Sequence, residues 1–331
     1  MQTPVKLAGL VVLAATLAVS QPSQAQVAQP RPSGGTAVET IEIRPRVHVI
    51  FGAGGNIVVH VGEDGVILVD SGSAAMADQV IAEVRKITQA PIRLIINTSA
   101  DVDHIGGNER VAGQGVNLDP RAVASGRPGA DVIAHENVLN RVSAPTGQQS
   151  AFPLGSWPSE TYISRIKSMY LNDEGIQVIY HPAAHSDGDS VVFFRKADVV
   201  VTGDIIDLRR FPMIDAARGG SVQGELDALN ALLDLVIPPM PLIYKEGRTL
   251  VVPGHGRIAD HAEIVEYRDM VTVIRGRIQS MLDKGLTLEQ VKAANPTYGY
   301  RTRYGSDTGD WTTDMFVEAV YKGLTRTPRT F

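Results

Sequence analysis

Short hydrophobic segments, some continuous and some alternating with polar residues, occur along the chain between glycine-containing turns. Three of them, 47–51, 56–61 and 65–70, follow one another closely and predict neighbouring β-strands. The next segment, 74–88, instead carries its apolar residues at helical spacing and ends before Pro91. It therefore predicts a helix.

The same two patterns alternate along the rest of the chain. Further strands are predicted at 92–97, 176–180, 190–194, 198–201 and 249–252, and 131–141 predicts a strand that passes into a helix. Further helices are predicted at 222–235, 260–284, 286–294 and 314–324. Strands and helices that alternate in two runs predict an α/β fold built in layers.

Composition agrees with one large globular domain that carries extensions. The 331 residues are 44% apolar and 20% charged. A net charge of −5 and the lack of any lysine- or arginine-rich run give no reason to expect nucleic acid or an anionic membrane as partner. With no cysteine, disulfides and thiolate metal ligands are excluded. The oligomeric state is left open.

The first residues have the pattern of an export signal. Lys6 precedes the apolar run 7–19, and Ser23-Gln24-Ala25 offers small residues for cleavage. We expect a signal peptide at 1–25, a disordered leader at 26–40, and a periplasmic or secreted bacterial protein. A membrane anchor is the alternative, but the apolar run is shorter than the roughly 20 residues that a spanning helix needs.

Candidate metal ligands occur in four separate segments. The first, Ser99-Ala100-Asp101-Val102-Asp103-His104, follows the predicted strand 92–97. The others are His185 before Asp187-Gly188-Asp189, Asp204 after Thr202-Gly203, and His255 within Pro253-Gly254-His255-Gly256. Taken singly, each of these residues could have a structural role instead of binding a metal, such as a capping aspartate, a packed histidine or the polar end of a strand.

In order and spacing these segments, together with 66–72, resemble the metallo-β-lactamase-fold hydrolase superfamily over residues 45–275. The family's His-x-His-x-Asp-His motif stands here as Ser-x-Asp-x-Asp-His at 99–104. The resemblance implies a four-layer αβ/βα sandwich at 41–275 and a C-terminal helical extension at 276–331.

The resemblance also implies a set of metal ligands. The family holds two metal ions side by side, and its second site is complete here in Asp103, His104 and His255. Asp204 matches the carboxylate that bridges the two ions, and His185 matches a ligand of the first site.

The two altered positions change the first site. Asp101 is a ligand or a solvated loop carboxylate, and both interpretations stay open; Ser99 is a hydrogen-bonding loop residue rather than a ligand. A site rich in carboxylate oxygen favours hard cations over zinc. We expect one zinc ion rather than two, with iron or manganese as alternatives.

A metal in the second site would lower the pKa of bound water to about 7 and provide a hydroxide nucleophile. We expect Asp101, Asp103 and Asp204 to be the catalytic carboxylates, with Asp204 or Asp101 taking the proton of the attacking water. The function that follows is an exported metal-dependent hydrolase of a small ester, thioester, lactone or amide; the altered motif does not point to β-lactams. The alternatives are a degenerate, non-hydrolytic protein that binds a ligand or partner, and a redox role with iron.

Some neighbouring residues are expected to support the site. Asp70 follows a buried strand and is expected to orient a metal-binding histidine, and His135 is expected to open a helix. Phe152 and Trp157 lie in a long irregular segment and are either core aromatics or part of a pocket wall.

Overall fold

The computed structural model describes residues 38–325 except 125, 127–128, 144–148, 151 and 241–246. The expected signal peptide at 1–25 and most of the expected leader at 26–40 lie outside the described residues. Residues 39 and 40 were expected in that leader but belong to the first strand, because Ile41 and its neighbours pair with the strand that follows.

Seven strands form the first sheet, in the order β1-β2-β3-β4-β5-β6-β7. They are β1 (Glu39–Arg44), β2 (Val47–Phe51), β3 (Ile57–Gly62), β4 (Gly65–Val69), β5 (Ile92–Ile96), β6 (Asp131–His135) and β7 (Glu160–Tyr162). Pairing is antiparallel from β1 to β4 and parallel from β4 to β7. The parallel strands end at one edge of this sheet, and loops that follow them meet there.

Five strands form the second sheet, in the order β12-β11-β10-β9-β8. They are β8 (Ile166–Leu171), β9 (Glu174–Tyr180), β10 (Ser190–Phe194), β11 (Val199–Asp207) and β12 (Leu250–His255). Only β11 and β12 pair in parallel among the described strands of this sheet.

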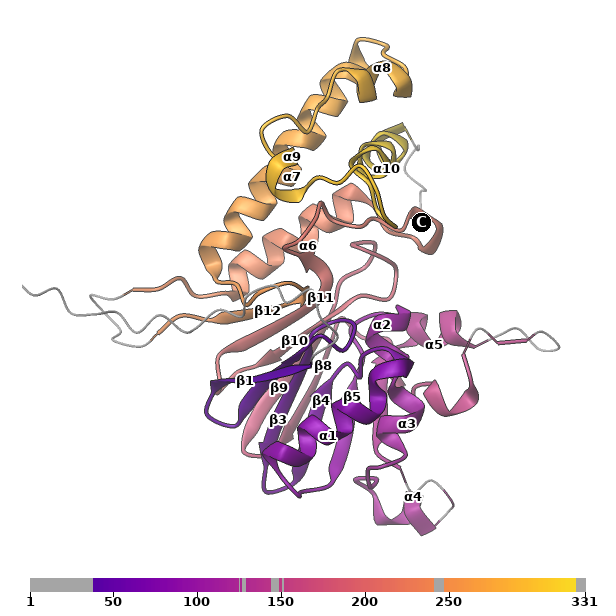
Figure 1. The fold of residues 1–331 in the computed structure, drawn as a ribbon, viewed down its shortest axis with the longest axis vertical. Helices are drawn as coiled ribbons and strands as arrows, with labels where there is room; N and C mark the ends of the chain where they lie inside the picture. Colours follow the sequence, from indigo (N-terminus) through magenta and orange to yellow (C-terminus); the bar gives the residue numbers. More distant parts are fainter. Residues whose placement is uncertain are drawn as a thin grey trace, which may run out of the picture. The chain divides into compact units, whose positions relative to one another are not determined.

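Helices cover the outer face of each sheet (Figure 1). The first sheet carries α1 (Ala77–Ile87), α3 (Asn108–Ala112) and α5 (Glu136–Val142), and the short helices α2 (Val102–Ile105) and α4 (Pro120–Ala124) belong to the segment between β5 and β6. The second sheet carries α6 (Val222–Leu235) and α7 (His261–Asp283), and α8 (Leu288–Ala293), α9 (Arg301–Tyr304) and α10 (Thr313–Thr325) follow. Within the described part of the chain, no helix has the length and apolar content that crossing a bilayer requires.

Alternation along the strands builds a core on both faces of each sheet. In β4, Ile67 and Val69 face the second sheet, whereas Val66 and Leu68 pack under α1 and α3. The sheets are therefore the two inner layers and the helices the two outer ones. The predicted four-layer αβ/βα sandwich with additional C-terminal helices is confirmed.

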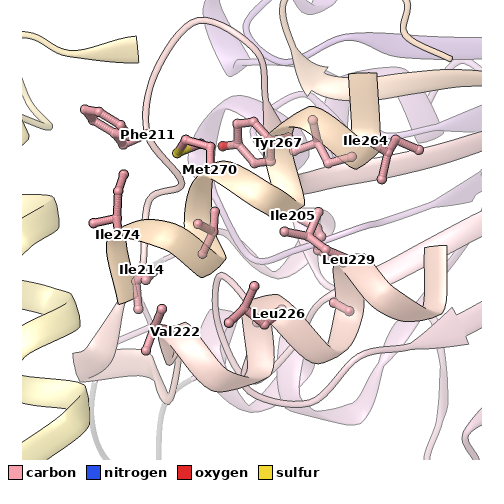
Figure 2. Packing of buried hydrophobic residues seen from close by; sticks show 14 of the residues in the cluster. Ile205, Phe211, Ile214, Val222, Leu226, Leu229, Ile264, Tyr267, Met270 and Ile274 are labelled. Carbon is pink, nitrogen blue, oxygen red and sulfur yellow. The ribbon is translucent and has the colours of Figure 1, made fainter. Parts of the chain in front are cut away.

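A third apolar cluster joins α6 and α7 to the second sheet. Figure 2 shows Leu226 and Leu229 of α6 and Tyr267 and Met270 of α7, which belong to the same buried cluster. An Asp260–Glu263 capping box begins α7, and the helix then runs without a break to Asp283. The expected domain boundary between 275 and 276 falls inside this continuous helix.

Most predicted elements are present, and the differences have local causes. The strands β1, β7 and β8 were not predicted, because β7 is short and β8 is an edge strand whose exposed residues include Ile166 and Tyr170. The segment 102–105, expected as loop, forms the short helix α2.

One carboxyl group lies in the apolar layer between α6 and the second sheet. The side chain of Glu225 is fully buried, and its oxygens accept no hydrogen bond from the described residues. Burial, followed by the nearby charge of Asp189, raises the pKa of Glu225 well above its ordinary value. The folded protein therefore favours the neutral acid.

Replacing Glu225 with glutamine should remove a pH-dependent loss of stability. The unfolded chain ionises this carboxyl above its ordinary pKa of 4.5, whereas the folded chain keeps the proton to higher pH. The unfolded state then binds fewer protons, so the free energy of unfolding of the wild type falls as pH rises. In urea unfolding, the stability gain of Glu225→Gln over wild type should grow as the pH rises above the ordinary pKa of 4.5.

The matched control is Glu63→Gln, which changes an exposed glutamate in the turn between β3 and β4. Its stability relative to wild type should stay constant over the same range. Parallel pH profiles for wild type and Glu225→Gln would contradict the buried neutral acid.

Candidate metal centre

The first sheet supplies a carboxylate that fixes one histidine. Asp70 follows β4 with a φ of 64°, and its carboxylate accepts hydrogen bonds from the backbone N–H and hydroxyl of Thr98 at 2.8 and 2.7 Å. The same carboxylate lies 2.7 Å from Nδ1 of the buried His104. A proton on Nδ1 leaves Nε2 free to bind a metal, so Asp70 orients His104 as expected.

The turn between β2 and β3 lies against this histidine. The backbone N–H of Gly55 donates to the carbonyl of Asp103 at 2.9 Å. A Cβ atom at Gly55 would lie 2.6 Å from Cε1 of His104, so only glycine leaves room for the imidazole. The glycine-rich run 52–55 was a visible signal for this close approach, and the sequence analysis did not use it.

The second sheet supplies two more side chains. In β11 the pairing register shifts around Gly203, whose φ is 53°, and this irregularity directs Asp204 toward His104. His255 ends the neighbouring strand β12. The side chain of Asn56 donates to the carbonyl of Pro253 at 2.9 Å and so ties the β2–β3 turn to the His255 loop.

His185 reaches the site from the loop between β9 and β10. Its Nδ1 lies 2.6 Å from the carbonyl of Met213, and its Nε2 lies 2.9 Å from a carboxylate oxygen of Asp101. Like His104, it therefore has one ring nitrogen held by the protein and the other directed toward the site.

Two sets of potential ligands result, and they share Asp204. The four-residue group contains Asp103, His104, Asp204 and His255, and the three-residue group contains Asp101, His185 and Asp204. The structure thus brings together all six residues that the sequence analysis named as metal ligands. It does not place Ser99 among them, because the hydroxyl of Ser99 accepts the backbone N–H of Asp101 at 3.2 Å.

The potential ligand atoms of the four-residue group all lie within 4.8 Å of one another, close enough to surround one metal ion. Nε2 of His104 lies 3.1 Å from Oδ1 of Asp204, and Nε2 of His255 lies 3.5 Å from the same oxygen and 3.0 Å from Asp103. Ligand atoms around a tetrahedral zinc ion lie roughly 3.3 to 3.6 Å apart. Two imidazoles and two carboxylates are also a donor set that zinc, iron and manganese accept.

The charges of these side chains depend on one another. Burial disfavours an ionised Asp204, but attraction to His104 outweighs burial and holds the pKa of Asp204 well below its usual range. Burial likewise opposes a charged His104, yet Asp204 and Asp70 together raise the pKa of His104 well above its usual range. Protons and a metal ion therefore compete for the same imidazole, and metal binding at this group releases protons.

The three-residue group contains an additional cation that sequence reasoning missed. The guanidinium of Arg218 forms an ion pair with Asp101 and a second one with Asp215 at 2.7 Å. No local pattern marks Arg218, because its position depends on how the segment after β11 folds back over the site.

A pocket of about 360 Å³ opens onto the four-residue group. Its other lining residues are Asp101, Val102, Asp207, Arg210, Met213 and Asp310. Arg210 pairs with Asp207 at 2.7 Å and with Asp310 at 3.2 Å, so the segment between α9 and α10 contributes to the wall.

The aromatic residues considered for this wall lie elsewhere. Phe152 and Trp157 pack against a buried cluster that includes residues of α5, and they are not among the described residues that line the pocket. His135 caps α5 by accepting the N–H of Asn137, which agrees with its expected role at a helix start.

Replacing Gly55 with alanine should weaken the binding of added zinc at least about tenfold, because the new methyl group displaces the His104 ring from its position beside Asp204. Competition with a chromophoric chelator measures this affinity. Gly276→Ala is the matched control, since a Cβ atom there meets no described atom within 4 Å on the exposed face of α7. It should leave zinc affinity unchanged and stabilise the protein by about 1 kcal/mol. Equal zinc affinity of folded Gly55→Ala and wild type would contradict this role.

Comparison with solved structures supports the fold. The stereoselective inverting sec-alkylsulfatase Pisa1 from Pseudomonas sp. aligns with a TM-score of 0.64 and 16% identity, over 86% of this chain and 50% of that one. A metallo-beta-lactamase from Pontibacter korlensis aligns with a TM-score of 0.52 and 15% identity, over 71% of this chain and 99% of that one. The chain thus spans half the length of the alkylsulfatase.

Among curated proteins, none matches this chain. A family model described as the metallo-beta-lactamase superfamily matches residues 51–255, a range that begins in β2 and ends at His255. The chain belongs to the metallo-beta-lactamase superfamily.

Proposed function

We propose that this chain is an exported hydrolase that holds one divalent metal ion, zinc in the first instance, in the four-residue group. The observation that carries the proposal is the convergence of His104 and His255, each through Nε2, with two carboxylates at one end of a pocket. Without a cation, a buried site of this composition destabilises the folded protein, because like-charged carboxylates repel at short range.

The bound ion would supply a Lewis acid and activate water at neutral pH. The protein's own groups then have separate tasks. His104 and His255 would hold the ion, and Asp70 keeps His104 in the required tautomer. Asp204 lies between the two ligand groups, where its carboxylate orients both imidazoles of the metal site.

Asp103 is the best placed of the three carboxylates to accept the proton of the attacking water. Its side chain is 36% exposed, compared with 12% for Asp101 and 9% for Asp204, so it faces the pocket most openly. Asp101 is less suited to this task because both of its oxygens already have partners, His185 and Arg218.

The pocket favours a small uncharged substrate. Five aspartates and one arginine line it, and because Arg209 and Arg218 each pair with one of these aspartates, one divalent cation would bring the net charge close to zero and leave no excess positive charge for an anion. Val102, which is 66% exposed, and Met213 offer apolar contacts. These features support a small ester, thioester, lactone or amide over an anionic substrate such as a sulfate ester or a carboxylate-bearing β-lactam.

The remaining parts of the proposal rest on the sequence. The signal pattern at 1–25 supports export to the periplasm or medium of a bacterium. The mature protein would act on a small molecule, without nucleic acid and without a membrane partner. The alkylsulfatase and metallo-beta-lactamase neighbours are named for hydrolytic activities, which agrees with a hydrolase.

The test is metal content and turnover of the mature protein and of His255→Ala. Zinc-loaded wild type should hold zinc after desalting and hydrolyse at least one member of a panel of neutral esters, lactones and amides. His255→Ala should lose most of both, because the variant removes one of two imidazole ligands. His261→Ala, which removes a histidine from the start of α7, is the control and should keep both.

A wild-type protein without bound metal after zinc loading would sink the proposal. So would turnover that survives in His255→Ala, and a panel in which metal binds but no substrate is cleaved would favour the non-hydrolytic alternative.

A further inference from the structure

Arg218 is held in place before any ligand arrives. Asp215 caps the short 3-10 helix 216–218 by accepting the backbone N–H groups of Ala217 and Arg218 at 3.0 and 2.9 Å. The same carboxylate accepts the Nε of Arg218 at 2.7 Å, and the carbonyl of Arg218 accepts the N–H of Asp187 at 2.9 Å. Backbone and side chain together therefore direct the guanidinium toward Asp101.

The guanidinium competes with a metal ion for Asp101. One oxygen of this carboxylate contacts Arg218 and the other lies 2.9 Å from Nε2 of His185. A guanidinium stays charged at every physiological pH, so a divalent cation on Asp101 would lie next to a permanent positive charge. The Asp101 side chain is only 12% exposed, and water screens this repulsion poorly.

The three-residue group also has few ligands to offer. Ser99 provides no ligand atom, since its hydroxyl oxygen accepts a hydrogen bond from the backbone N–H of Asp101. Asp204, the third member, already belongs to the four-residue group. A second ion would therefore have three potential ligands: Asp101, which Arg218 neutralises, Asp204, which the four-residue group shares, and His185.

We propose that the guanidinium of Arg218 provides the positive charge that a second metal ion would otherwise supply. Its guanidinium neutralises Asp101, and Asp101 in turn holds His185 in one orientation, so the centre binds a single divalent ion beside a built-in organic cation. This inference rests on the proposed function, because it assumes that the four-residue group holds an ion. It makes Arg218 a positioning residue rather than a catalytic one.

The test counts metal ions. Wild type, Arg218→Met and Arg141→Met are loaded with excess zinc, desalted and analysed for metal per chain, and zinc titration calorimetry follows the number of binding events. Methionine keeps the unbranched apolar stem of the side chain without the charged guanidinium. Arg141 is the matched control, because it pairs with Asp187 in the His185 loop at 2.5 Å and does not contact Asp101.

Wild type and Arg141→Met should each bind close to one ion per chain, and Arg218→Met should bind a second, weaker one. Two ions in wild type would overturn the inference and leave the proposed function standing; no ion in wild type would overturn both. A folded Arg218→Met that still binds one ion would also overturn it. If that variant fails to fold, Arg218→Gln takes its place in the same comparison, with the same two outcomes.

Discussion

Three carboxylates, those of Asp101, Asp103 and Asp204, lie close together in a partly dehydrated volume, and the rest of the structure depends on how their charge is balanced. Each has an imidazole within about 3 Å, an arrangement that offsets part of the repulsion. Further cations are needed to balance the negative charge that the imidazoles do not offset. Arg218 provides one, and a divalent ion in the four-residue group would provide another.

The fold brings these carboxylates and imidazoles together by joining the two sheets at one edge. Asp70 and the helix α2 follow parallel strands of the first sheet, and Asp204 and His255 come from the parallel pair of the second. The shift in register at Gly203 and the missing side chain at Gly55 bring the two sets within ligand distance. A mobile surface loop could not hold like charges this close, whereas packed strands can.

Apolar alternation is a local property, so the sequence predicted most strands and helices directly. The four-layer arrangement and the six candidate ligands followed from the resemblance to the metallo-β-lactamase superfamily. The sequence did not reveal β8, whose exposed residues hide the alternation, or the fold-back that brings Arg218 to Asp101. An ion pair between residues that are far apart in the sequence does not produce a recognisable residue spacing along the chain. The same limit explains why Asp101 stayed ambiguous until its partners His185 and Arg218 were known.

X-ray absorption spectroscopy of the zinc-loaded protein tests the central claim most directly, because it counts the imidazoles around the metal. Ligation by His104 and His255 predicts two imidazoles, oxygen atoms in the remaining positions, and no scattering from a second zinc ion. A third imidazole would mean that His185 also binds the metal ion, and a zinc–zinc signal would mean that Arg218 does not exclude a second ion. Either result would contradict the account.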